Sequence, residues 1–120
     1  MIKNKTKKTV LAKKIRYCRN VFQKGFGLML KREKAVKDTG WLFIFRNPRK
    51  ISITMAFVSF PIDIIFLDAD SRVVDAVEGL KPWRLYDSWK YASYCIELQK
   101  GTLKRTRTKI GDIVSFNENP

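Results

Sequence analysis

The chain has 120 residues, which is enough for one hydrophobic core and too few for two ordinary domains. Hydrophobic residues make up 45% and aromatic residues 12% of it, and this composition excludes wholesale disorder. Histidine is absent, so Ser-His-Asp triads, Cys-His pairs and imidazole zinc sites are excluded.

The formal net charge is +14, and it is unevenly distributed. Residues 1–50 hold 16 Lys and Arg against two acids, whereas residues 51–120 hold nine of each sign. This asymmetry predicts attraction to a polyanion: nucleic acid, an anionic membrane or an acidic protein. The candidate anion-binding residues are Lys7, Lys8, Lys13, Lys14, Arg16 and Arg19. The alternative is a basic surface without a dedicated partner.

The first half of the chain predicts a tail, two strands and a helix. Residues 1–8 are expected to form a flexible basic tail, and residues 9–18 a strand with alternating basic residues. Asn20 is a typical helix cap, and apolar residues recur at helical spacing up to Leu30. Residues 41–45 form an aromatic strand.

The second half predicts several further short strands. They are expected over residues 51–58, 62–67, 72–77, 94–98 and 113–116, with a hairpin turn at 68–71. Residues 79–87 are expected to form a loop, residues 102–108 a single helical turn, and residues 118–120 a frayed end. Trp83 and Trp89 are expected to cap an open barrel end, and stacking on a sugar or base is the alternative. The prediction is a mainly β (α+β) fold: one compact rolled sheet or partial β-barrel, spanning residues 9–117, with one helix near its N-terminus.

The apolar runs of the chain are shorter than a membrane-spanning helix, and this bears on its localisation. The longest uncharged run covers residues 51–62, against about 18 residues for a spanning helix. No secretory signal is recognisable, so we expect a cytoplasmic protein without a transmembrane segment. Cys18 and Cys95 lie far apart and form no C-x-x-C pair, which favours free buried thiols.

Three carboxylates are the candidates for acid–base chemistry. Asp63 opens a strand, Glu97 lies between two apolar residues, and Asp112 follows a glycine at a turn. A pocket would join them with Met55 and Pro61, and we expect Asp63 and Glu97 on adjacent strands. The alternative is that the two aspartates bind backbone N–H groups at turns and that Glu97 faces water. No metal site and no cofactor are predicted.

Several short motifs occur in an order typical of one family. They are Gly27-Leu28-Met29, Gly40 to Phe45, Met55, Pro61 to Asp68, Val73-Val74, Tyr94 to Leu98 with Gly101, and Gly111 to Phe116. From about Ile15 to Phe116 the chain resembles domain-of-unknown-function family 192, also called uncharacterised protein family 0127. The resemblance implies a compact β-rich fold with one helix near the start, and no established activity. Where that family usually shows F-W-M-K-N-T, this chain has Ile53-Thr54-Met55-Ala56-Phe57-Val58.

The favoured hypothesis is a non-enzymatic binding module whose basic half contacts an anionic partner, with nucleic acid as one candidate. The first alternative is a small-molecule pocket, hydrolytic or lyase-like, around Asp63 and Glu97. The second is a structural or adaptor domain whose charge serves solubility.

Overall fold

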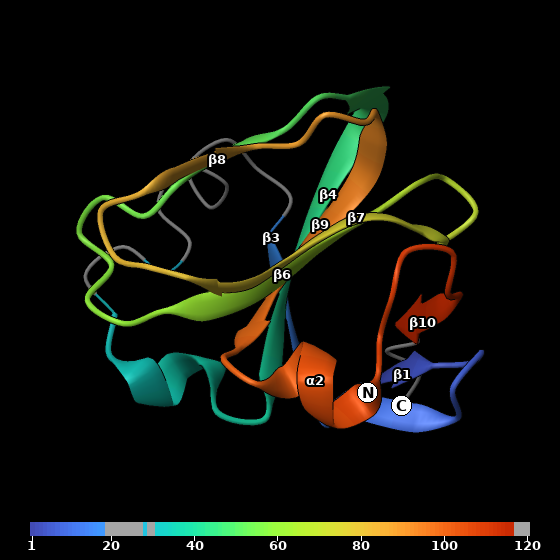
Figure 1. Ribbon diagram of the computed structural model, residues 1–120, viewed down its shortest axis with the longest axis horizontal. Coiled ribbons are helices and arrows are strands. Elements are labelled where there is room, and N and C mark those ends of the chain that lie inside the picture. Colours follow the sequence, from blue (N-terminus) through green and yellow to red (C-terminus); the bar gives the residue numbers. More distant parts are fainter. Residues whose placement is uncertain (19–27, 29–30, 117–120) are drawn as a thin grey trace.

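The computed structural model describes residues 1–18, 28 and 31–116 (Figure 1). Its centre is a five-stranded sheet with the strand order β3-β4-β9-β6-β7. These strands are β3 (Lys14–Cys18), β4 (Thr39–Arg49), β6 (Ile62–Leu67), β7 (Val73–Leu80) and β9 (Ala92–Gln99). All neighbouring pairs are antiparallel except β3 and β4, which run parallel.

Two smaller units cover the two faces of this sheet. A two-stranded ribbon of β5 (Ser52–Thr54) and β8 (Leu85–Asp87) lies over one face, which we call the ribbon face. The other face, the helix face, packs against α2 (Thr102–Thr106) and a three-stranded sheet ordered β10-β1-β2. That small sheet comprises β1 (Ile2–Asn4), β2 (Thr9–Ala12) and β10 (Val114–Phe116). A short 3-10 helix, η1 (Glu33–Val36), precedes β4.

The central strands divide their side chains between two apolar clusters. On β6, Ile62, Ile64 and Phe66 belong to the cluster on the ribbon face, whereas Ile65 and Leu67 belong to the cluster on the helix face. Successive side chains of a strand point to opposite faces, and a strand buried on both sides therefore reads as a continuous apolar run. The prediction of a mainly β fold is confirmed, and the sheets are open. The α-helix of the described residues, α2, lies near the C-terminus, whereas the helix was predicted near the N-terminus.

Several predicted elements agree with the structure. The strands at 62–67, 72–77, 94–98 and 113–116 and the helical turn after residue 102 are present with small shifts in their ends. The hairpin turn is also present: the Asp68 side chain accepts hydrogen bonds from the backbone N–H groups of Asp70 and Arg72. The helix predicted from Asn20 to Leu30 and the frayed end at 118–120 lie outside the described residues.

The predicted flexible tail at residues 1–8 is wrong. Ile2 and Asn4 are fully buried in β1, which pairs with both β2 and β10. The Asn4 amide donates to the side chains of Thr108 and Asp112, at 3.0 and 2.9 Å. The basic composition of residues 1–8 misled the prediction, although Ile2 and Asn4 point inward. A three-residue strand is too short to show the alternation of buried and exposed side chains.

Three other predictions need correction. The strand expected over residues 9–18 is two strands, because β2 and β3 join different sheets. The strand expected over 51–58 is reduced to β5, and the loop expected over 79–87 contains the end of β7 and all of β8. The last two errors have one cause: β5 and β8 pair mainly with each other, and short strands of this kind form through long-range contacts that local propensity does not report.

Candidate functional site

The three candidate carboxylates do not share a site. In the pairing of β6 with β9, Asp63 lies opposite Leu98, while Glu97 lies opposite Ile64. Asp63 and Glu97 are thus on adjacent strands, as predicted, but they point to opposite faces of the sheet. Asp112 lies at the turn before β10, beside the small sheet. An acid–base pair of Asp63 and Glu97 is therefore excluded by the register.

Asp63 organises three backbone segments on the helix face. It is fully buried, and its two oxygens accept hydrogen bonds from the N–H groups of Gly79, Gly101 and Leu103 at 2.9, 3.1 and 2.9 Å. Two of these donors lie at the start of α2, where Gly101 offers no side chain to cap the helix. The alternative predicted for this residue, satisfaction of backbone N–H groups at a turn, describes its environment.

Asp112 ties the N-terminal strand to the rest of the chain. One of its oxygens accepts hydrogen bonds from the Asn4 amide and from the Lys109 N–H, and it forms an ion pair with Lys7 at 2.9 Å. Burial opposes the charge, but these hydrogen bonds and the Lys7 ammonium outweigh it and lower the pKa of Asp112 below its ordinary 3.8. Lys7 is thereby engaged in the fold, and its ammonium also donates to the Arg107 carbonyl.

Glu97 is the candidate whose environment the sequence did not anticipate. It is 7% exposed and lies on the ribbon face, between Trp41 of β4 and Ile64 of β6. Burial raises its pKa from 4.5 to about 8, so the carboxyl is mostly protonated at neutral pH. Neither of the predicted roles fits, since Glu97 does not face water and its proposed partner Asp63 lies on the other face of the sheet.

The two cysteines lie on the same face as Glu97. Both are free and buried, and Phe43 of β4 lies between them in the register. One intervening strand separates their Cα atoms by about 10 Å, too far for a disulfide. Burial, followed by the nearby Glu97, raises the pKa of Cys18 to about 11 and that of Cys95 well above its ordinary value. Both are therefore neutral thiols and poor nucleophiles, which confirms the prediction of free buried cysteines.

A basic groove runs along the outer edge of the central sheet. It has a volume of about 380 Å³ and is lined by Lys14, Ile15, Arg16, Lys31, Ala35, Thr39 and Trp41. Lys14 and Arg16 are two residues apart on β3 and so project from the same face, while Lys31 belongs to the segment that leads into η1. The described lining includes three cationic side chains and no carboxylate.

The floor of this groove is held in place by Trp41. The indole N–H donates to the Ala35 carbonyl at 2.8 Å, which fixes η1 against β4. The Arg16 guanidinium lies over the same ring, 5.4 Å from its centroid. The cation–π contact restricts the motion of the guanidinium. Two of the predicted anion-binding residues, Lys14 and Arg16, thus meet at one hollow.

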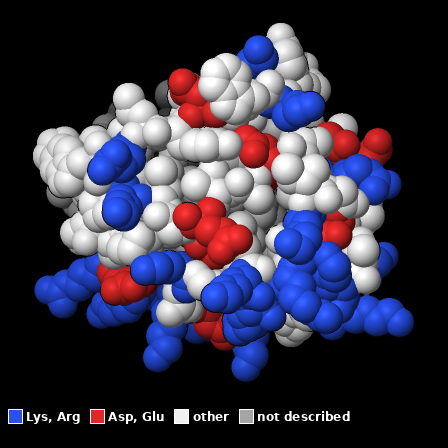
Figure 2. All heavy atoms as spheres, viewed as in Figure 1, with Lys and Arg blue, Asp and Glu red and all other residues white. Residues whose placement is uncertain are grey.

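The remaining predicted basic residues are dispersed. Lys8 and Lys13 are exposed and do not line this groove, and Arg19 lies outside the described residues. Figure 2 shows Lys and Arg side chains crowded over η1, α2 and the β1–β2 turn, in the lower half of the view. The second half of the chain contributes to this region, since Arg105 and Arg107 of the α2 segment donate to carbonyls of residues 7, 10 and 11. Basic residues from both halves of the chain therefore share one region of the structure.

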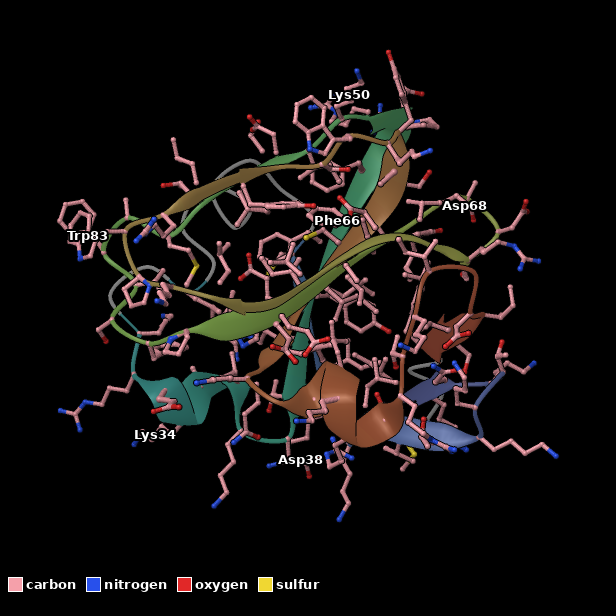
Figure 3. All side chains as sticks on the ribbon, in the orientation of Figure 1. Lys34, Asp38, Lys50, Phe66, Asp68 and Trp83 are labelled. Atoms are coloured by element: carbon pink, nitrogen blue, oxygen red, sulfur yellow. The ribbon has the colours of Figure 1, made fainter. Side chains whose placement is uncertain are left out.

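Met55 and Pro61 support the fold around the ribbon. Met55 is buried in the ribbon-face cluster, and its carbonyl accepts hydrogen bonds from the N–H groups of Val58 and Trp83. Pro61 is half-buried just before β6. Trp83 and Trp89 do not cap a barrel end: they are 64% and 76% exposed, and the labelled Trp83 projects from the molecule in Figure 3. No group of three or more metal-ligating side chains occurs in the ranges that the structure describes.

Comparison with known proteins gives one family. Residues 2–116 match the family model DUF192, described as "Uncharacterized ACR, COG1430". A UPF0127 protein of Thermococcus kodakarensis is 34% identical over 120 residues, which cover 97% of this chain and 73% of that protein. A UPF0127 protein of Pyrococcus abyssi is 32% identical over 120 residues, covering 97% of each.

Two solved structures are similar over most of the chain. A Sinorhizobium meliloti protein titled a "putative transcription regulator" has a TM-score of 0.78 and 29% identity, covering 84% of this chain and 79% of that one. A protein of unknown function from Novosphingobium aromaticivorans has the same TM-score and 24% identity, covering 85% and 74%. At that identity the second similarity shows the fold alone.

Proposed function

This chain belongs to the DUF192 family, and we propose that it is a non-enzymatic binding module that holds an anionic ligand in the basic groove between β3 and η1. The observation that carries the proposal is the convergence of Lys14, Arg16 and Lys31 on one hollow with no described carboxylate in its lining. Like charges brought together without a counter-charge cost stability, so an arrangement of this kind favours an anion.

The geometry of the groove supports binding of a compact anionic group. The volume of about 380 Å³ lies within the range of small-molecule sites. Arg16 is already oriented by its contact with Trp41, which reduces the entropy lost on binding. A guanidinium donates two parallel hydrogen bonds to a phosphate, sulphate or carboxylate, and the two ammonium groups add charge.

A binding role also agrees with the state of the reactive groups. Asp63 has both of its carboxylate oxygens, and Asp112 one, committed to hydrogen bonds within the fold. The thiols of Cys18 and Cys95 are neutral, and the Glu97 carboxyl is on the interior side of Trp41 in the register. The described lining of the groove offers cations, which bind anions, and an indole whose N–H already donates to Ala35.

Titration with a sulphated, heparin-like polymer and with inorganic tripolyphosphate tests the proposal. The double variant Lys14→Gln/Arg16→Gln should weaken binding and reduce the slope of log affinity against log salt by about 2, one step for each lost contact. The matched control is Lys100→Gln/Lys109→Gln, which removes the same charge from exposed positions outside the groove. If both double variants lose affinity equally, the interaction is with general surface charge and the groove is not the site.

We assign the ligand only by its anionic group. Nothing in the described part of the chain favours nucleic acid over other polyanions, so that partner stays a prediction, as does the cytoplasmic location. The small-molecule alternative loses the Asp63–Glu97 pair on which it depended. A structural or adaptor role is the outcome if neither polymer nor tripolyphosphate binds at low salt.

A further inference from the structure

A second surface, remote in sequence from the groove residues of β3, carries exposed aromatic side chains. Four aromatic residues near β8 are more than half exposed, and we call them the aromatic row: Phe57, Trp83, Trp89 and Tyr91. Leu85 of β8 lies among them in the sequence and is also more than half exposed. Tyr86 of the same segment points inward and stacks on Phe66 at 5.9 Å. From Trp83 to Trp89 the chain extends at most about 20 Å. The row therefore lies on the outer side of the ribbon, opposite to the core.

Part of the row is held in an unfavourable backbone conformation. Phe57 and Trp83 have φ angles of 60° and 64°, in the left-handed region that bulky residues rarely adopt. Their rings meet edge to face, with centroids 4.9 Å apart. Burial in the core does not explain these two side chains, because both are more than half exposed. Strain retained at exposed aromatic residues is a reason to look for a function at that position.

Basic side chains accompany the row. Lys81, Arg84 and Lys90 alternate with its members along the chain and are exposed, and Lys50 lies in the adjoining turn before β5. The one acid between residues 80 and 91 is Asp87, whose carboxylate accepts a hydrogen bond from the Ser52 hydroxyl at 2.6 Å. The surroundings of the row are thus cationic.

We propose that the aromatic row docks the protein on a lipid surface that carries anionic headgroups. Trp and Tyr are the side chains that lie at the boundary between headgroups and acyl chains, where an apolar ring and a polar atom are both accommodated. Lysine and arginine beside them attract anionic headgroups, which adds to the burial of the rings. No described helix is long and apolar enough to cross a membrane, so this contact would be peripheral.

The shape of the surface favours lipid over a second protein. Trp83 projects from the edge of the molecule in Figure 3, and the two tryptophans lie beyond opposite ends of β8. A protein partner would need a complementary surface that matches this spacing, with anchors clustered at the centre of the interface. Lipid headgroups rearrange around each ring, so a lipid surface does not have to match the spacing of the rings.

Co-sedimentation with vesicles tests the inference, using phosphatidylcholine alone and phosphatidylcholine mixed with phosphatidylserine, at physiological salt. The protein should bind the mixed vesicles, and its tryptophan emission should shift to the blue as Trp83 and Trp89 leave water. Trp83→Ser/Trp89→Ser should lower partitioning about a hundredfold, since each indole removed from water contributes about one tenfold step. The control Ile110→Ser removes a side chain that is 65% exposed elsewhere and should bind as the parent does.

Each other result contradicts the inference. Equal partitioning of the parent and the Trp83→Ser/Trp89→Ser variant would mean that net charge alone attracts the protein. Equal binding to both kinds of vesicle would exclude a role for anionic headgroups. Self-association that the same variant abolishes, without vesicle binding, would identify a second copy of the chain as the occupant. The Lys14→Gln/Arg16→Gln variant should still bind vesicles, so failure of the groove proposal and failure of this one are distinguishable.

Discussion

The buried carboxyl of Glu97 makes a prediction about how stability depends on pH. Glu97 is 7% exposed, and burial raises its pKa from 4.5 to about 8. Between these two values the folded chain retains a proton that the unfolded chain has released. Stability therefore falls as the pH rises through this window and is constant above it. Glu97→Gln keeps the shape of the side chain and removes the ionisation, so the variant should lack this loss.

The size of the effect follows from the two pKa values. A difference of one between the folded and unfolded pKa values corresponds to about 1.4 kcal/mol. The penalty of ionising Glu97 is therefore about 1 kcal/mol at pH 5, about 3 kcal/mol at pH 7 and about 5 kcal/mol at pH 9. Glutamine has its own cost of burial, but that cost is the same at every pH. The difference between variant and parent should thus grow by about 4 kcal/mol from pH 5 to pH 9.

Urea unfolding at pH 5, 7 and 9, followed by far-UV circular dichroism, measures this difference. The control is Glu78→Gln, which neutralises an exposed carboxylate on β7 and should show no such growth. Asp112 does not interfere, because its lowered pKa confines its contribution to more acidic solutions, where stability is lost as the pH falls. A Glu97→Gln difference that is the same at pH 5 and pH 9 would refute the reasoning, because the carboxyl would then titrate as it does in water.

Three further substitutions test the packing and the backbone. Gly40→Ala should destabilise the fold by about 1–3 kcal/mol, because the new Cβ would collide with Cδ1 of the buried Ile2. Adding Ile2→Val to the same chain removes that methyl group and should restore part of the loss, as measured by a thermal melt. Asp63→Asn should cost about 3 kcal/mol in urea unfolding, since its amide group would face backbone N–H donors such as that of Gly101; a variant as stable as the parent would contradict the capping role. Phe57→Asn should be more stable than Phe57→Ala by about 0.5–1 kcal/mol, because Asn tolerates a positive φ while both variants lose the contact with Trp83; equal midpoints would show that this position is not strained.

The strain at Phe57 bears on how the sequence resemblance is interpreted. The related pattern F-W-M-K-N-T places asparagine where this chain has Phe57, and the residue has a φ of 60°. Asparagine is one of the few residues that adopts this conformation readily. Its presence in the pattern is thus explained by the backbone conformation of the turn.

The strands of the central sheet could be predicted from the sequence because their signal is local. The apolar run of β6, the turn chemistry of Asp68 and the alternation around Glu97 each depend on residues close together in the chain. The same alternation placed Glu97 on the face opposite to Ile96 and Leu98, and this is correct. The convergence of Lys14 and Arg16 on one side of a strand also follows from a spacing of two.

What covers each face was decided by the tertiary structure. A period of two says which side chains share a face, but it does not say whether that face meets water or another layer of the protein. The face of Glu97 carries an apolar cluster against which ribbon residues such as Ile53 and Tyr86 pack, and a carboxyl that the pattern allowed to be solvated is buried there. Lys31 joins Arg16 because β3 pairs with β4, which places Arg16 beside Trp41, and Trp41 holds η1 in turn. Contacts of this kind depend on pairing between distant segments, which no local property of the sequence encodes.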